Sequence, residues 1–340
     1  MTSELNTPIL TVGVIGLGRV GSAIVRAVAA LPRESGIRLV GVSTHRLHDP
    51  CTLADEVGVP VLGQVDLLCF ADLCVLAAPD DALPGAAADL AAAFHGEVRE
   101  DAGALVHCSG AIDGSVLDPV TAAGWTVGAW HPLQAFPTTA SPLRAGITWA
   151  VTAPEPLAGR LRALSAALGG RPVDLGADAK PRYHAAASMA ANYLVTQAWH
   201  AVCLLEHCGL SRAAALAALV PLLESTVAGL AAAGLPDGLT GPLARGDVAT
   251  IARHLDALDG APTPDTAALY RTAGMATLPL LAARGADAGL LSRLTVLLGG
   301  SAPPAAQRGD VLEDHPRKGD DEQVAEGHDG PEGPPAGGPR

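Results

Sequence analysis

The chain of 340 residues is long enough for two domains, and its formal net charge of −13 argues against a nucleic-acid partner, which would require a basic face. No apolar run approaches the roughly 20 residues needed to cross a bilayer, and the first residues lack the basic and apolar segments of a secretion signal. The six cysteines form no C-x-x-C pair and show no disulfide-like spacing. We therefore expect a cytoplasmic protein with reduced thiols and no membrane or nucleic-acid partner.

The first half of the chain alternates short apolar runs with helix-like stretches. Runs with few polar interruptions, separated by helices, are typical of a parallel sheet covered on both faces. We predict a doubly wound α/β domain over residues 10–176, after an N-terminal extension over residues 1–9. Its predicted strands are "ILTVGVIG", "IRLVGVST", "LCVLAAP", "GALVHCSG", "WTVGAWHP", "GITWAVTA" and "RPVDL".

After about residue 175 the pattern changes to helices alone. The first of these helices lies in "KPRYHAAASMAANYLV", and the next is the alanine-rich "SRAAALAALVPLLESTVAGLAAAG". We predict an all-helical C-terminal domain over residues 177–300. Residues 301–340 are rich in Gly, Pro and acidic residues and carry few large apolar side chains, so we expect a disordered tail.

A glycine motif lies between the first predicted strand and the helix that follows it. Gly16, Gly18 and Gly21 form G-x-G-x-x-G, in which the glycines allow a tight turn, close backbone approach to a pyrophosphate and tight helix–strand packing. The following helix N-terminus favours bound phosphate. The sequence therefore predicts a Rossmann-type dinucleotide site formed by Gly16, Leu17, Gly18, Arg19, Val20 and Gly21.

The end of the second predicted strand bears on the choice of dinucleotide. An NAD site usually has an acidic residue about 20 residues beyond the glycines, where it binds the ribose hydroxyls. The segment "LVGVSTHR" offers Ser43 and Arg46 and no acid. A hydroxyl and a guanidinium would bind a 2′-phosphate, whereas an acid would repel it. We therefore predict NADP as the cofactor and regard NAD as less favoured.

Other strand ends supply further candidates, because ligands bind at the carboxyl ends of strands in open α/β sheets. Ala78 and Pro79 follow one predicted strand and Ser109 follows the next, so we expect these residues to contact the cofactor. Asp80 and Asp81 are interpreted as caps of the helix that begins after them.

The helix that follows the sheet domain carries polar residues at intervals of four. His184, Ser188 and Asn192 fall on one side of it, and Lys180 lies at its N-terminal end, where a carboxylate could bind. This stripe either faces the nicotinamide or satisfies backbone groups of neighbouring helices, and we favour the first interpretation. His184 or Lys180 would then protonate the substrate, Asn192 would orient it, and Ser188 would lie between them.

Two other segments supply candidate substrate residues. His131 in "WHPLQAF" ends a predicted strand, although a structural turn stabilised by Pro132 would also explain it. Arg245 in "TGPLARGDVAT" could pair with an anionic substrate, and Asp247 is predicted to be the N-cap of the next helix. No histidine or acid pair has metal-ligand spacing, so we expect no metal.

Five segments occurring in order together resemble one family. They are the glycine motif, "HCSGA" (107–111), "WHPLQAF" (130–136), "KPRYHAAASMAANYLV" (180–195) and "TGPLARGDVATIARHL" (240–255). Over about residues 10–298 the chain resembles the family that joins a Rossmann-like domain to domain of unknown function 2520. This resemblance implies an NADP oxidoreductase whose two-domain plan is similar to that of ketopantoate reductases, pyrroline-carboxylate reductases and hydroxyacid dehydrogenases.

The motifs and the resemblance together predict an NADP-dependent oxidoreductase. The expected reaction is hydride transfer to the carbonyl of a small, anionic 2-oxo acid (2-dehydropantoate-like). Reduction of an imine (pyrroline-carboxylate-like) is a close variant, and a non-catalytic NADP sensor or scaffold is the alternative from another class. We also expect a homodimer formed through the helical domain, whose helices carry more apolar surface than one layer could bury.

Overall fold

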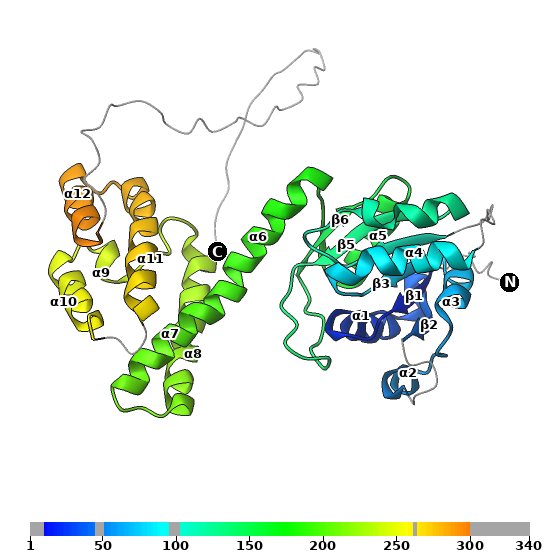
Figure 1. Ribbon diagram of the computed structural model, residues 1–340, viewed down its shortest axis with the longest axis horizontal. Helices are drawn as coiled ribbons and strands as arrows, with labels where there is room; N and C mark the ends of the chain where they lie inside the picture. The colour runs from blue at the N-terminus through cyan, green and yellow to red at the C-terminus, as the bar shows by residue number, and fades with distance from the viewer. Residues whose placement is uncertain (1–9, 45–50, 95–102, 261–263, 300–340) are drawn as a thin grey trace, which may run out of the picture. The chain divides into compact units, whose positions relative to one another are not determined.

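The computed structural model describes residues 10–44, 51–94, 103–260 and 264–299 (Figure 1). The predicted tail, the N-terminal extension and Arg46 lie outside these ranges. The chain divides into two compact units, Met1–Leu222 and Leu223–Arg340, with the division inside one long helix. The domain boundary predicted near residue 176 stays a prediction.

The first unit contains a seven-stranded sheet in the order β2-β1-β3-β4-β5-β6-β7. Every predicted strand is present, and the neighbouring pairs from β2 to β5 are parallel. However, β6 is antiparallel to β5, and β7 is parallel to β6, so the sheet is mixed. No helix forms between β5 and β6, and an antiparallel pair needs no crossover helix. The strands are β1 Leu10–Ile15, β2 Ile37–Ser43, β3 Leu73–Leu76, β4 Ala104–His107, β5 Thr126–Pro132, β6 Thr148–Thr152 and β7 Arg171–Asp174.

Two hydrophobic clusters lie on opposite faces of this sheet because successive strand side chains alternate between them. Val12 and Val14 of β1 pack in the cluster that includes α1, α2 and α5, whereas Ile15 packs with α3, α4 and the 3₁₀ segment η3. Helices therefore cover both faces, as a doubly wound fold requires. The bounds are α1 Arg19–Ala29, α2 Thr52–Val57, α3 Gln64–Phe70, α4 Leu83–Ala93, α5 Leu157–Ala167 and η3 Gly114–Ala123.

Helices alone follow the sheet. Figure 1 shows α6 (Lys180–Ala190) and α7 (Asn192–His207) nearly in line, with Ala191 between them. Next comes α8 (Arg212–Ala233), within which the chain is divided into the two units. The second unit contains α9 (Gly241–Ala244), α10 (Val248–Leu258), α11 (Pro264–Ala283) and α12 (Ala288–Leu297). Its core is formed by Ile251, Leu255, Leu281, Leu294 and Leu298.

Two capping predictions have different outcomes. The Asp247 carboxylate accepts a hydrogen bond from the backbone N–H of Thr250 and caps α10, as predicted. The caps predicted at Asp80 and Asp81 are wrong. These residues form a short 3₁₀ turn, and α4 begins at Leu83 without a side-chain cap.

The helix α8 corrects the expectation about apolar runs. It has 22 residues, and its most apolar stretch has a mean hydropathy of 1.7. By length and composition alone this helix could cross a bilayer, so the statement that no run approaches that length is wrong. Pro221 and Glu224 divide the segment into shorter apolar runs in the sequence, but the helix continues through both.

Candidate functional site

The carboxyl ends of the parallel strands meet at one edge of the sheet. Ile15, which ends β1, pairs with Ser43 at the end of β2 and with Leu76 at the end of β3. Leu76 in turn pairs with His107 at the end of β4. The loops that follow these strands therefore begin side by side, and β5 continues past this line to His131 and Pro132.

The glycine loop at this edge is closely packed at two of its glycines and open at the third. Gly16 has φ 93°, and a Cβ there would lie 2.5 Å from the Ala77 carbonyl oxygen. A Cβ at Gly21 would lie 1.9 Å from the Gly16 carbonyl oxygen, so these two positions require glycine. A Cβ at Gly18 would meet nothing within 4 Å. The loop Gly16–Gly21, called the glycine cradle below, is open at Gly18, as close approach of a pyrophosphate requires.

The helix after the cradle is also suited to phosphate. α1 begins at Arg19, which is exposed, and has no acidic residue in its first turn. Its free N–H groups favour an anion. Leu17 and Val20 are half-buried, and their side chains pack against the core cluster. The residues present therefore fit a dinucleotide pyrophosphate.

The predicted cofactor residues that follow β2 and β3 differ in how exposed they are. Ser43 is fully buried, and its hydroxyl has no hydrogen-bond partner among the described residues. Its side chain therefore lies beneath the rim, and a direct contact with a 2′-phosphate would require its neighbours to move. Arg46 lies outside the described residues. Ala78 is half-buried and Pro79 is exposed, and both lie within three residues of the end of β3.

The loop after β4 is fixed by His107, which is fully buried. Its Nδ1 accepts a 3.1 Å hydrogen bond from the Ser109 N–H, and its Nε2 lies 2.8 Å from the Asp113 carbonyl oxygen. The Ser109 hydroxyl oxygen accepts hydrogen bonds from the N–H groups of Ala111 and Ile112. These four contacts hold residues 107–113 in one compact turn at the strand edge.

Lys180 approaches this turn from the start of α6. Its side chain is fully buried, and its Nζ donates a 3.0 Å hydrogen bond to the Ser109 carbonyl oxygen. Burial lowers the pKa of Lys180 to about 8, against the opposing attraction of Asp113, Asp80 and Cys108. The sequence placed Lys180 at an open helix end that could hold a carboxylate; the structure instead turns this ammonium inward onto a backbone carbonyl.

Two histidines flank the same turn. A Cβ at Gly110 would lie 2.5 Å from His184 Nδ1 and 2.9 Å from His131 Nε2, so only glycine leaves room for both rings. The two rings meet edge to face, with centroids 6.0 Å apart. The His184 Nδ1 is buried and has no hydrogen-bond partner among the described residues.

Tyr183 completes this group. Its hydroxyl lies 2.8 Å from His131 Nδ1. Burial, together with the neighbouring basic groups Lys180, His184 and His107, lowers the pKa of His131 to about 4. Burial also raises the pKa of Tyr183 to about 12, so at neutral pH a neutral ring and a protonated phenol share one hydrogen bond. We call Ser109, His131, Lys180, Tyr183 and His184 the strand-end cluster.

Two predicted site residues of the first unit lie outside the strand-end cluster, and a third belongs to the second unit. Ser188 is half-buried one turn beyond His184, and Asn192 is exposed at the first residue of α7. Within the described ranges no hydrogen bond joins either side chain to the strand-end cluster. Arg245 belongs to the second unit, where it is exposed at the end of α9.

The sequence reasoning missed His107, Gly110 and Tyr183. A histidine inside the apolar run "GALVHCSG" was a usable signal, because a buried imidazole must find hydrogen-bond partners. The role of Tyr183 had no such signal, since its contact with His131 joins residues 52 positions apart.

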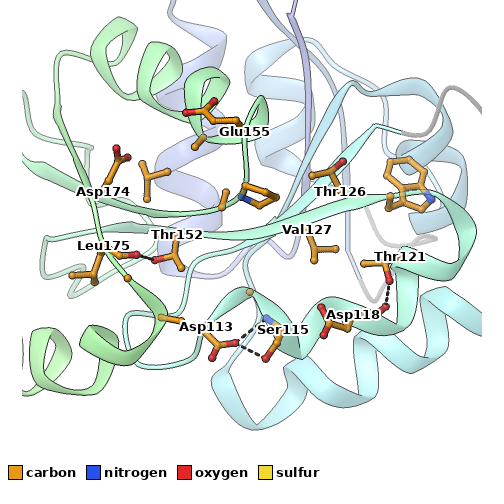
Figure 2. Close-up of a pocket in the computed structure, with 18 of the residues that line it drawn as sticks. Asp113, Ser115, Asp118, Thr121, Thr126, Val127, Thr152, Glu155, Asp174 and Leu175 are labelled. Carbon is orange, nitrogen blue, oxygen red and sulfur yellow. Dashed lines mark hydrogen bonds between the residues drawn. The ribbon is translucent and has the colours of Figure 1, made fainter.

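A cavity of about 820 Å³ lies at the sheet edge opposite the carboxyl ends of the parallel strands (Figure 2). It opens where β5 begins at Thr126 and where β6 and β7 end at Thr152 and Asp174. At its rim Arg162 forms ion pairs with Glu155 and Asp174. Among the described residues that line it there is no histidine and no lysine. We therefore place the candidate site at the strand-end cluster and not in this cavity.

The fold and the glycine cradle define the protein as a Rossmann-like α/β protein with a helical C-terminal part. Two family models match the chain: the Rossmann-like domain over residues 1–132 and the domain of unknown function DUF2520 over residues 147–277. The chain thus carries both domains of the family that its motifs resembled.

Solved structures share this fold. A protein of Bacteroides fragilis described as a candidate NADP oxidoreductase is 20% identical, with a TM-score of 0.58 over 81% of this chain and 99% of that one. A Thermotoga maritima protein is 17% identical, with a TM-score of 0.60 over 81% and 100% of the two chains. An imine reductase from a Pseudomonas species is 18% identical, with a TM-score of 0.54 over 85% and 99%. A comparison with functionally curated proteins found no match.

Proposed function

We propose that this protein is an NADP-dependent oxidoreductase that reduces a C=O or C=N bond. One observation carries the proposal: the glycine cradle and the strand-end cluster follow strands whose last residues are paired. Ile15 pairs with Leu76, and Leu76 pairs with His107. A dinucleotide lying along this edge from the cradle would extend toward Ser109 and the histidines beyond it.

The glycine cradle and the N-terminus of α1 would hold the pyrophosphate, and the turn at Ser109 would lie beside the nicotinamide. NADPH, when bound, would supply the hydride. Ser43 and Thr44, the described residues at the end of β2, are uncharged, which favours NADP over NAD because no acid there would repel a 2′-phosphate. The Bacteroides fragilis protein with this fold is also described in terms of NADP.

We assign proton donation to His184. Its ring is half-buried rather than enclosed, and no hydrogen bond in the described part engages its Nδ1. Lys180 is fully covered and already donates to Ser109. Its ammonium would act as a fixed positive charge that stabilises negative charge developing on the substrate oxygen. His131 would stay neutral and donate or accept a hydrogen bond through its Nε2.

A small 2-oxo acid (2-dehydropantoate-like) is the substrate class we favour. Reduction of a carbonyl produces an alkoxide that needs both a proton and a positive charge, and His184 and Lys180 can supply these. An imine is the second candidate, because the imine reductase from Pseudomonas has the same fold and a similar hydride path would serve a C=N bond.

The proposal is tested by following NADPH consumption with a panel of small 2-oxo acids and cyclic imines. Turnover with one class and not the other would select the substrate. NADPH binding without turnover of either class would contradict the enzymatic proposal and favour the alternative, a non-catalytic NADP sensor or scaffold.

We further propose a homodimer formed through α7 and α8. Exposed apolar side chains on these helices include Val195, Trp199, Leu216 and Leu222, a surface that a second copy of the chain would cover. A cytoplasmic location is also part of the proposal, supported by six cysteines that are all free. Of these cysteines Cys74 is buried, whereas Cys69 is exposed.

A further inference from the structure

A buried histidine outside the proposed chemistry contacts the residue that holds Lys180. The N–H of Ser109 donates to His107 Nδ1, and the carbonyl oxygen of Ser109 accepts from Lys180 Nζ. His107 and Lys180 are both fully buried, and they engage opposite sides of the same residue. Any movement of Ser109 away from His107 would therefore also disturb the lysine.

The contacts of His107 determine its tautomer. The Ser109 N–H can only donate, so Nδ1 must carry a lone pair. The Asp113 carbonyl can only accept, so Nε2 must carry the hydrogen. Each ring nitrogen thus has one role, and both roles require the neutral ring. Burial lowers the pKa of His107, which agrees with this geometry.

We propose that His107 is a positioning residue: acting through Ser109, it holds the Lys180 ammonium in its buried place beside the two histidines. Its Nδ1 fixes the residue that receives the ammonium, and its Nε2 fixes the far end of the turn at Asp113. For the effect of Lys180 on turnover this inference rests on the proposed function. The placement of the ammonium itself does not depend on any substrate.

Two amide variants separate the two contacts of the ring. In His107→Asn the amide oxygen replaces Nδ1 and can still accept from Ser109, but nothing reaches Asp113. In His107→Gln the amide nitrogen replaces Nε2 and can still donate to Asp113, but the acceptor for Ser109 is lost. Both side chains are neutral and polar, so they form a matched pair.

Because the chain has few lysines, the reactivity of the Lys180 amine can be measured directly. The sequence has only two lysines, Lys180 and Lys318. The folded protein is acylated with an N-hydroxysuccinimide ester and then digested, and the modification at each lysine is followed by mass spectrometry of the peptides. Lys318 serves as the reference for reagent activity in every sample. Because a buried, hydrogen-bonded amine reacts slowly, the Lys180/Lys318 ratio reports whether the ammonium is held.

We expect Asn at position 107 to keep the ratio near the wild-type value and Gln to raise it about tenfold, as loss of one buried hydrogen bond allows. The charged and titratable groups around the lysine (Asp80, Cys108, Asp113, His107 and His131) make a fixed pH necessary. Equal ratios in the two variants, or a rise in Asn alone, would overturn the proposal.

A measurement on the unmodified protein decides the matter even if a variant does not fold. The ¹⁵N chemical shifts of the His107 ring should show hydrogen on Nε2 and none on Nδ1. This pattern should hold throughout the pH range around 6.5 in which free histidine titrates. The opposite tautomer or a charged ring would overturn the proposal. In turnover, His107→Gln should lower kcat more than His107→Asn does. Absence of any turnover would count against the proposed function, whereas the acylation ratio and the ¹⁵N shifts would still decide the role of His107.

Discussion

The Nζ atom of Lys180 donates a 3.0 Å hydrogen bond to the carbonyl oxygen of Ser109, a residue 71 positions earlier in the chain. This contact ties the first residue of α6 to the turn that follows β4. It also brings His184, one helical turn further along α6, to Gly110 and His131. The helix that follows the sheet thereby becomes part of the sheet's ligand edge.

Replacing His184 with Gln should lower turnover by about 10²-fold or more, the usual contribution of a general acid. Stability should change little, because the buried His184 Nδ1 makes no hydrogen bond within the described residues that the change could remove. His207→Gln, at an exposed position in the last turn of α7, is the control and should retain full activity. Loss of stability with unchanged specific activity would show that His184 has a packing role.

Gly110→Ala should separate cofactor binding from catalysis. The added Cβ would lie 2.5 Å from His184 Nδ1 and 2.9 Å from His131 Nε2, so both rings must move. We expect a large fall in kcat with an unchanged Kd for NADPH. Gly85→Ala is the matched control, since a Cβ at this exposed position in α4 meets nothing within 4 Å and should be tolerated. Full activity of the Gly110→Ala variant would contradict the assigned site.

His131 should make the protein sensitive to acid. Burial lowers its pKa from 6.5 to about 4, so the unfolded state binds a proton that the folded state excludes between these values. The stability contributed by the neutral ring is present above about pH 6.5 and is lost progressively as pH falls through about 4. In thermal melts across this window, His131→Asn should lose less stability than the wild type. Parallel curves for the two proteins would contradict the assignment.

Arg46→Ala should weaken binding of NADPH and leave binding of NADH nearly unchanged, because a guanidinium would pair with the 2′-phosphate that only NADPH carries. This prediction rests on the sequence, since Arg46 lies outside the described residues. Titration of both cofactors against both proteins measures it. An equal loss for NADPH and NADH would remove the argument for NADP selectivity.

Val195→Lys should convert a dimer into a monomer, because Val195 is 70% exposed on α7 and a charge there would oppose burial of this apolar surface. Light scattering at micromolar concentration should give twice the chain mass for the wild type and the chain mass for the variant. A wild-type protein that is monomeric under these conditions would contradict the proposed homodimer.

The fold could be predicted because its signals are local. All seven strands were found from apolar runs, and the cradle was found from the spacing of Gly16, Gly18 and Gly21. The direction of β6 could not be predicted, since it depends on how the chain between β5 and β6 returns to the sheet. An apolar run such as that of β6 reads the same in either direction.

The site could be predicted only in part, for a related reason. Helical spacing grouped His184 with Ser188 and Asn192 on one face, but spacing does not reveal what packs on that face. The burial of Lys180 depends on a turn 71 residues away. One signal was present: a chain that uses arginine for nearly all its basic residues has a lysine at position 180. Of these two side chains only lysine can lose its proton when buried, because arginine stays charged.

The most direct test of the central claim uses NADPH carrying deuterium at the transferred position of its nicotinamide ring. The protein is incubated with this cofactor and each 2-oxo acid or cyclic imine that supports NADPH consumption. The mass of the product is then measured by mass spectrometry. The account predicts a product heavier by one deuterium, formed by the wild type and nearly abolished by His184→Gln. A product without deuterium, or equal product from both proteins, would contradict hydride transfer at the strand-end cluster.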